Sequence, residues 1–161
     1  MGIVGAKVES AKLEYHTFVK DELVLVVPPA FSWARRKSVS PSDLKKIPFV
    51  LREEGSGTGM VMKNALKNQG VDMSDLNVVA ILGSTMAVLQ AVRNGVGCSV
   101  VSRRAVQDGF STGALKSVPV QRITFSRDFY LVIRRGKSKS PLCEAFFNFL
   151  LDKSHTDTLT T

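Results

Sequence analysis

The residues best suited to chemistry in this sequence lie in two short segments rich in glycine and hydroxyl side chains. The first, Gly55-Ser56-Gly57-Thr58-Gly59, follows a predicted strand and precedes a predicted helix. Glycines let a ligand approach the backbone closely, and the unpaired N–H groups of a helix N-terminus favour negative charge. Ser56, Gly57 and Thr58 are therefore candidate binding residues for a small anion or a carboxylate. Simple helix capping by Ser56 or Thr58 is the alternative, and it needs no ligand.

The second segment, Gly83-Ser84-Thr85, repeats this chemistry before another predicted helix. Neighbouring parallel strands bring their carboxyl ends to one edge of a sheet, and ligands of open α/β folds bind at that edge. We therefore expect Gly83, Ser84 and Thr85 to share one crevice with the first segment. Two such helix starts favour a ligand, although capping would also explain both.

The motifs of catalysis are incomplete. A dinucleotide fingerprint needs glycine where Met60 stands, a nucleophile elbow needs glycine at Glu54, and no lysine follows the glycines as in a phosphate loop. His16 and His155 do not support a catalytic triad or a metal site, and Glu53 and Glu54 are expected to be solvated. We predict a binding protein without catalytic residues, metal or cofactor.

Composition is typical of a globular protein. The 161 residues are 44% hydrophobic and 22% charged, enough for one domain or two small lobes. Apolar runs are only strand-length, so no membrane span is predicted.

The net charge is +8, but the basic residues occur in scattered pairs without aromatics between them, so direct DNA binding is not expected. Cys98 and Cys143, in apolar contexts and without a leader sequence before them, indicate buried thiols in the cytoplasm.

The predicted elements alternate between strand and helix. We expect strands at 2–6, 13–18, 22–27, 47–51, 77–82, 98–101 and 129–133, and helices at 60–68, 85–94 and 141–151. Strand followed by helix occurs twice between residues 47 and 101, which is typical of a parallel sheet. The strand at 77–82 is expected to be buried. The last helix is expected to face a core with Phe146, Phe147, Leu150 and Leu151.

Taken in order, these segments resemble the effector-binding domain of the LysR-type transcriptional regulators. The resemblance covers nearly the whole chain, and the common order and spacing of its pieces make it specific. The matching pieces are Gly2-Ile3-Val4-Gly5, residues 18–28, Arg52-Glu53-Glu54-Gly55-Ser56-Gly57-Thr58, Gly83-Ser84, residues 91–97, Val100-Val101-Ser102 and residues 127–132.

The resemblance implies an α/β fold of the type 2 periplasmic-binding-protein kind, in which two lobes are joined by two crossing strands. Residues 1–27 would be a remnant of the first lobe with the first crossing strand, and residues 28–127 the second lobe. Residues 128–152 would be the return strand and C-terminal helix, and 153–161 a disordered tail. The first lobe is expected to be incomplete, because family members carry a winged helix-turn-helix, a linker helix and further βα units before this point.

The function implied by the resemblance is that of a small-molecule effector sensor. It would control DNA binding allosterically through a helix-turn-helix domain outside this chain, in a homodimer or higher oligomer. A lobe that lacks strands exposes sheet edges, which also favours oligomerisation. A solute-binding protein of a transport system, with the same fold, is the alternative.

Overall fold

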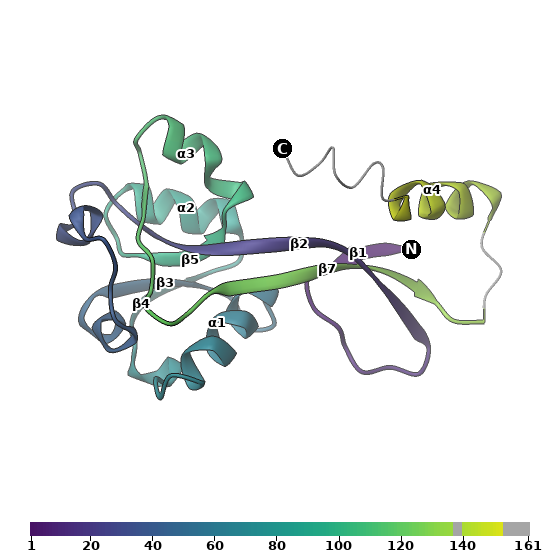
Figure 1. Cartoon of the computed structure of the whole chain (residues 1–161), viewed down its shortest axis with the longest axis horizontal. Helices are drawn as coiled ribbons and strands as arrows, with labels where there is room; N and C mark the ends of the chain where they lie inside the picture. Colours follow the sequence, from purple (N-terminus) through teal and green to yellow (C-terminus); the bar gives the residue numbers. More distant parts are fainter. Residues whose placement is uncertain (137–139, 153–161) are drawn as a thin grey trace. The chain divides into compact units, whose positions relative to one another are not determined.

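The computed structural model describes residues 1–136 and 140–152 (Figure 1). The chain divides into two compact units, one comprising Met1–Asp21 and Arg127–Thr161 and the other Glu22–Ser126. Two strands, β2 (Leu13–Val27) and β7 (Phe125–Arg134), contribute residues to both units. The predicted disordered tail lies outside the described residues.

A single strand, β2, replaces the two strands predicted between residues 13 and 27, and that prediction was wrong. That prediction left residues 19–21 outside both strands. Instead Asp21 is fully buried, and Arg127 Nε of β7 donates a hydrogen bond of 2.9 Å to Asp21 Oδ2. Because this buried carboxylate has a cationic partner 106 residues away in the sequence, β2 can continue through it.

The larger unit contains a layer of four longer strands, and the two-residue strand β6 (Lys116–Ser117) pairs with one of them, β2. β5 (Ser99–Ser102) pairs antiparallel with β2, and β3 (Pro48–Arg52) pairs in parallel with β4 (Asn77–Leu82), as predicted. Residue Cys98 joins the two pairs, because its N–H donates to Pro48 O (2.8 Å) and its carbonyl accepts from Val50 N (2.9 Å). The strands therefore follow the order β4, β3, β5, β2.

Helices α1 (Gly57–Lys67) and α2 (Thr85–Arg93) cover opposite faces of this layer. Alternate side chains of β2 point to opposite faces. Leu23, Leu25 and Val27 share a core with Met62 and Leu66 of α1. Val24 and Val26 share a second core with Val88, Leu89 and Val92 of α2. The shorter elements of this unit are the 3₁₀ turns Ser32–Arg35, Pro41–Lys46, Met73–Asp75 and Arg104–Val106, helix α3 (Gln107–Ser111) and strand β6 (Lys116–Ser117).

Strand β4 is largely exposed, so the prediction that residues 77–82 are buried was wrong. The exposed fractions of Val79 and Ile81 are 48% and 64%. β4 is the edge of its sheet, with β3 as its paired strand, and Val79 and Ile81 lie on the face of the strand opposite to Ala80 and Leu82. Only Ala80 and Leu82 pack against the core from this strand. An apolar run indicates a strand but does not distinguish an edge strand from a central one.

In the smaller unit, β1 (Gly2–Val4) pairs antiparallel with β7, and α4 (Pro141–Leu151) packs through Phe147. Leu150 and Leu151 lie against the same small core, whereas Phe146 is 49% exposed, contrary to prediction. Successive residues of a helix point about 100° apart, so Phe146 leaves the face on which Phe147 is buried. Among the described residues, no helix combines the length and the hydropathy that crossing a membrane requires.

We predict that Gly97→Ala lowers the free energy of unfolding by about 1–3 kcal/mol. A Cβ atom at Gly97 would lie 2.6 Å from Pro48 O, so the backbone contact between β3 and residues 97–98 must open. Urea denaturation measures the change. Gly59→Ala is the matched control, because a Cβ there meets nothing within 4 Å and alanine favours the helix, so stability should rise by about 0.5–1 kcal/mol. Equal effects of the two substitutions would contradict this account.

Candidate functional site

The two predicted turns lie at the carboxyl ends of neighbouring parallel strands. Arg52, the last residue of β3, is the register partner of Leu82, the last residue of β4. The chain then leads from β3 to α1 and from β4 to α2. The structure thus brings Ser56, Gly57 and Thr58 to the same sheet edge as Gly83, Ser84 and Thr85.

Both turns cap their helices. Ser56 Oγ accepts a hydrogen bond from Gly59 N (3.4 Å), and Ser84 Oγ accepts one from Ala87 N (3.1 Å). The capping alternative is therefore satisfied, but a hydroxyl that accepts through its oxygen still has a hydrogen to donate. Ser84 is exposed and can reach a ligand, whereas Thr58 is only 9% exposed and offers it little surface.

Arg52 connects the two turns directly. Its Nη1 donates to Thr85 Oγ1 over 2.7 Å, while its Nε and Nη2 donate to the two carboxylate oxygens of Glu53 over 2.7 and 2.6 Å. Glu53, expected to be solvated, is 43% exposed and in addition forms an ion pair with Arg52. These bonds use three of the five guanidinium N–H groups, and within the described residues the other two have no hydrogen-bond acceptor, so they can serve an anion.

The ion pair keeps both partners charged. The hydrogen bonds from Arg52 hold the pKa of Glu53 below its usual range, and the same bonds raise the pKa of Arg52. Sequence reasoning missed Arg52. The available signal was an arginine at the end of a predicted strand, directly before a glycine-rich turn, where a positive charge adds to that of the helix N-termini.

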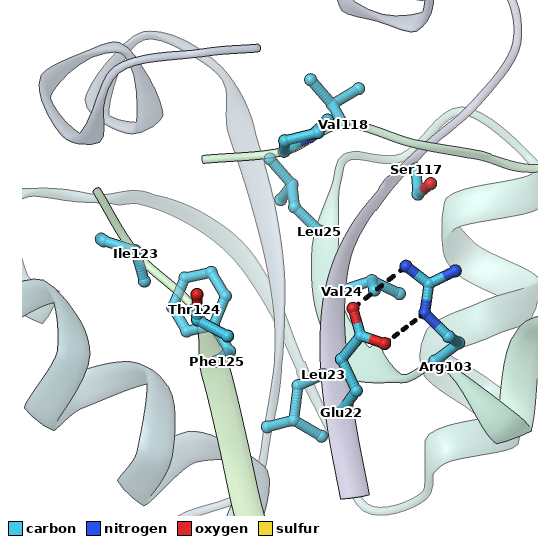
Figure 2. Close-up of a pocket in the computed structure, with 11 residues that line it drawn as sticks. Glu22, Leu23, Val24, Leu25, Arg103, Ser117, Val118, Ile123, Thr124 and Phe125 are labelled. Atoms are coloured by element: carbon cyan, nitrogen blue, oxygen red, sulfur yellow. Dashed lines mark hydrogen bonds and ion pairs between the residues drawn. The ribbon is translucent and has the colours of Figure 1, made fainter. Parts of the chain in front are cut away.

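A second arginine lies at the same sheet edge. Arg103 follows β5, whose preceding residue Cys98 pairs in parallel with β3. Its Nε donates to Glu22 Oε2 (2.6 Å) and its Nη2 to Glu22 Oε1 (3.1 Å), and its backbone N–H donates to Glu22 O (2.8 Å). Figure 2 shows this pair at a pocket of about 210 Å³. The sequence interpretation had treated Arg103 as part of a scattered basic surface.

Other reactive groups do not join this site. Burial raises the pKa of the Cys98 thiol and makes it a poor nucleophile, and His16 Nε2 lies 2.8 Å from Glu14 Oε1 in the smaller unit. The described part of the chain has no cluster of His, Cys, Asp and Glu side chains that could hold a metal. His155 lies outside the described residues. The geometry offers cations and hydroxyl donors, which bind anions.

We predict that Arg52→Gln raises the pKa of Glu53 toward that of a free glutamate, as measured by NMR titration of the carboxyl carbon. A carboxyl with a lowered pKa stabilises the fold above its unfolded-state pKa of about 4.3, and that contribution is lost as pH falls through the lower folded-state pKa. This pH-dependent contribution should therefore shrink in the variant. The pKa of Asp75, lowered by Lys45, should not change. An unchanged pKa of Glu53 would exclude Arg52 as its partner.

Known proteins are similar to this sequence. Residues 1–154 match the family described as the LysR substrate binding domain. An uncharacterized HTH-type transcriptional regulator of Methanocaldococcus jannaschii is 39% identical over 85% of this chain and 46% of its own length. The RuBisCO operon transcriptional regulator of Allochromatium vinosum is 33% identical over 94% of this chain and 49% of its own length. The chain thus spans about half the length of these curated relatives.

The fold is shared with solved structures of regulatory domains. The CcmR regulatory domain of Synechocystis PCC6803, solved in complex with 2-PG, matches with a TM-score of 0.82 and 27% identity, over 92% of this chain and 70% of that chain. The α/β, periplasmic-binding-protein-like architecture expected from the sequence is confirmed. By its sequence match over residues 1–154 and by its fold, the chain belongs to the LysR substrate binding domain family.

Proposed function

We propose that this chain senses a small anionic effector for a LysR-type transcriptional regulator. The observation that carries the proposal is Arg52, which joins the two hydroxyl-rich turns and presents unused N–H groups at the edge where ligands of α/β sheets bind. The proposed contact residues are Arg52 together with Ser56, Gly57, Thr58, Gly83, Ser84 and Thr85. Binding rather than turnover is the proposed role of this set.

A phosphate or a carboxylate is the ligand chemistry that this edge favours. Two helix N-termini point to it, and each contributes partial positive charge. Arg52 adds a full charge in a planar fork that matches such groups. The complex of the related CcmR domain with 2-PG supports a small-molecule effector.

Effector binding is proposed to control a DNA-binding domain outside this chain. The curated relatives are about twice as long as this chain and are named as transcriptional regulators. This supports effector binding by this chain and DNA binding by a separate domain. Strands β2 and β7 connect the two units, so a ligand that prefers one arrangement of these strands would bias the whole regulator. These relatives favour a regulator in the cytoplasm over a solute-binding protein of a transport system.

Self-association is the second part of the proposal. Leu142, Phe146 and Phe149 follow helical spacing along α4 and are 81%, 49% and 52% exposed. Such an apolar stripe is costly to leave in water, and the same stripe on a second copy is its proposed partner.

We predict that light scattering shows a dimer or larger oligomer, and that the double substitution Phe146→Ser with Phe149→Ser shifts the chain toward the monomer. A monomer at all concentrations would contradict this part.

For ligand binding, we predict that Thr85→Val and Arg52→Gln each weaken the binding of 2-PG at least about tenfold, because each removes a group aimed at the anion. Isothermal titration calorimetry with 2-PG, inorganic phosphate and uncharged glycerol measures the effect. Ser111→Ala, on α3 and outside the proposed contact set, is the matched hydroxyl control and should leave affinity unchanged. Preferential binding of glycerol, or full affinity in Arg52→Gln, would refute an anion site at this edge.

A further inference from the structure

A pocket beside β2 contains none of the proposed effector-contact residues. It has a volume of about 210 Å³, the space of about seven liquid water molecules. All of its lining residues belong to the larger unit. They come from the second half of β2, from Arg103, and from the segment 117–125 that connects β6 to β7.

One end of this pocket is apolar and held in place. Leu25, Val118 and Phe125 are at most 4% exposed and belong to the core that α1 covers. Val118 N donates to Leu25 O over 3.0 Å, which ties the segment 117–125 to β2. Because these side chains are packed from behind, the apolar end keeps its shape whether or not a ligand is present.

The other end is charged and exposed. The side chains of Arg103 and Glu22 are 45% and 53% exposed. Figure 2 shows Arg103 on one side of the strand that carries Glu22, with Thr124 and Phe125 on the other. Ion pairs this exposed are screened by water and weakly held. A second carboxylate can therefore take the place of Glu22 without leaving the guanidinium unpaired.

We infer that this pocket is a second ligand site, for a small monocarboxylic acid with a compact apolar body. The carboxylate replaces that of Glu22 on Arg103, and the body lies against Leu25, Val118 and Phe125. The exposed residue Thr124 also lines the pocket, across β2 from Arg103. A neutral ligand of the same shape gains the apolar contacts but cannot displace Glu22.

The test uses cyclohexanecarboxylate and its uncharged analogue cyclohexanecarboxamide. Each is titrated into the chain while backbone amide signals are followed by NMR. We expect the carboxylate to shift the signals of residues 22–25 and 117–125 and to bind at least about tenfold more tightly than the carboxamide. Equal affinity for the two compounds, or no binding of the carboxylate at millimolar concentration, would overturn the inference.

Two charge substitutions should act in opposite directions. Arg103→Gln removes the cation and should weaken carboxylate binding at least about tenfold. Glu22→Gln removes the competing anion and should tighten it severalfold. Lys116→Gln is the matched control, because it removes the same charge next to Ser117 yet Lys116 does not line the pocket. A loss in Lys116→Gln equal to that in Arg103→Gln would mean general charge attraction and would refute the site.

Two further variants distinguish binding in this pocket from binding at the proposed effector site. Ser117→Phe fills the mouth from an exposed position and should abolish cyclohexanecarboxylate binding without disturbing the core. Ser84→Ala should leave this binding unchanged. If Ser84→Ala weakens it and Ser117→Phe does not, the acid occupies the edge of β3 and β4, and the second site is wrong while the effector proposal stands.

Discussion

The close backbone contact between β3 and residues 97–98 is the constraint on which the geometry of the larger unit depends. The hydrogen bonds of Cys98 with Pro48 and Val50 place β5 beside β3 in parallel, so the carboxyl ends of β4, β3 and β5 reach one edge. Gly97 permits this approach, because a Cβ there would meet the Pro48 carbonyl at 2.6 Å. Without it, Arg52 and Thr85 would still meet, but Arg103 would not share their edge.

The same layer supports the candidate site, and its charged groups lie at the edge of the layer. α1 and α2 bury opposite faces of the sheet, and β2 contributes alternate residues to the two cores. The polar residues are confined to the edge where strands end and helices begin, so their cost of desolvation is small. Each arginine there is already paired with a carboxylate of the chain, Arg52 with Glu53 and Arg103 with Glu22.

Much of this arrangement was predictable from the sequence. The parallel pair β3 and β4, the helices after both glycine-rich turns and the convergence of the turns follow from local patterns and from the geometry of βα units. The continuity of β2 was not predictable, because it depends on the ion pair between Asp21 and Arg127. The exposure of β4 was not predictable either, because a local apolar pattern does not show whether another element of the fold covers the strand.

The role of the arginines was hidden for a related reason. A sequence shows that Arg52 and Arg103 are basic but not which donors they leave free, since that depends on carboxylates and hydroxyls brought together by folding. Thr85 is 33 residues from Arg52, and Glu22 is 81 residues from Arg103. An arginine held by an exposed carboxylate stays oriented, yet it exchanges that partner for a ligand anion at little cost. In these proposals, Arg103 would exchange Glu22 for a ligand anion, whereas Arg52 would keep Glu53 and bind an anion through its remaining N–H groups, and both arrangements would select against neutral molecules of the same shape.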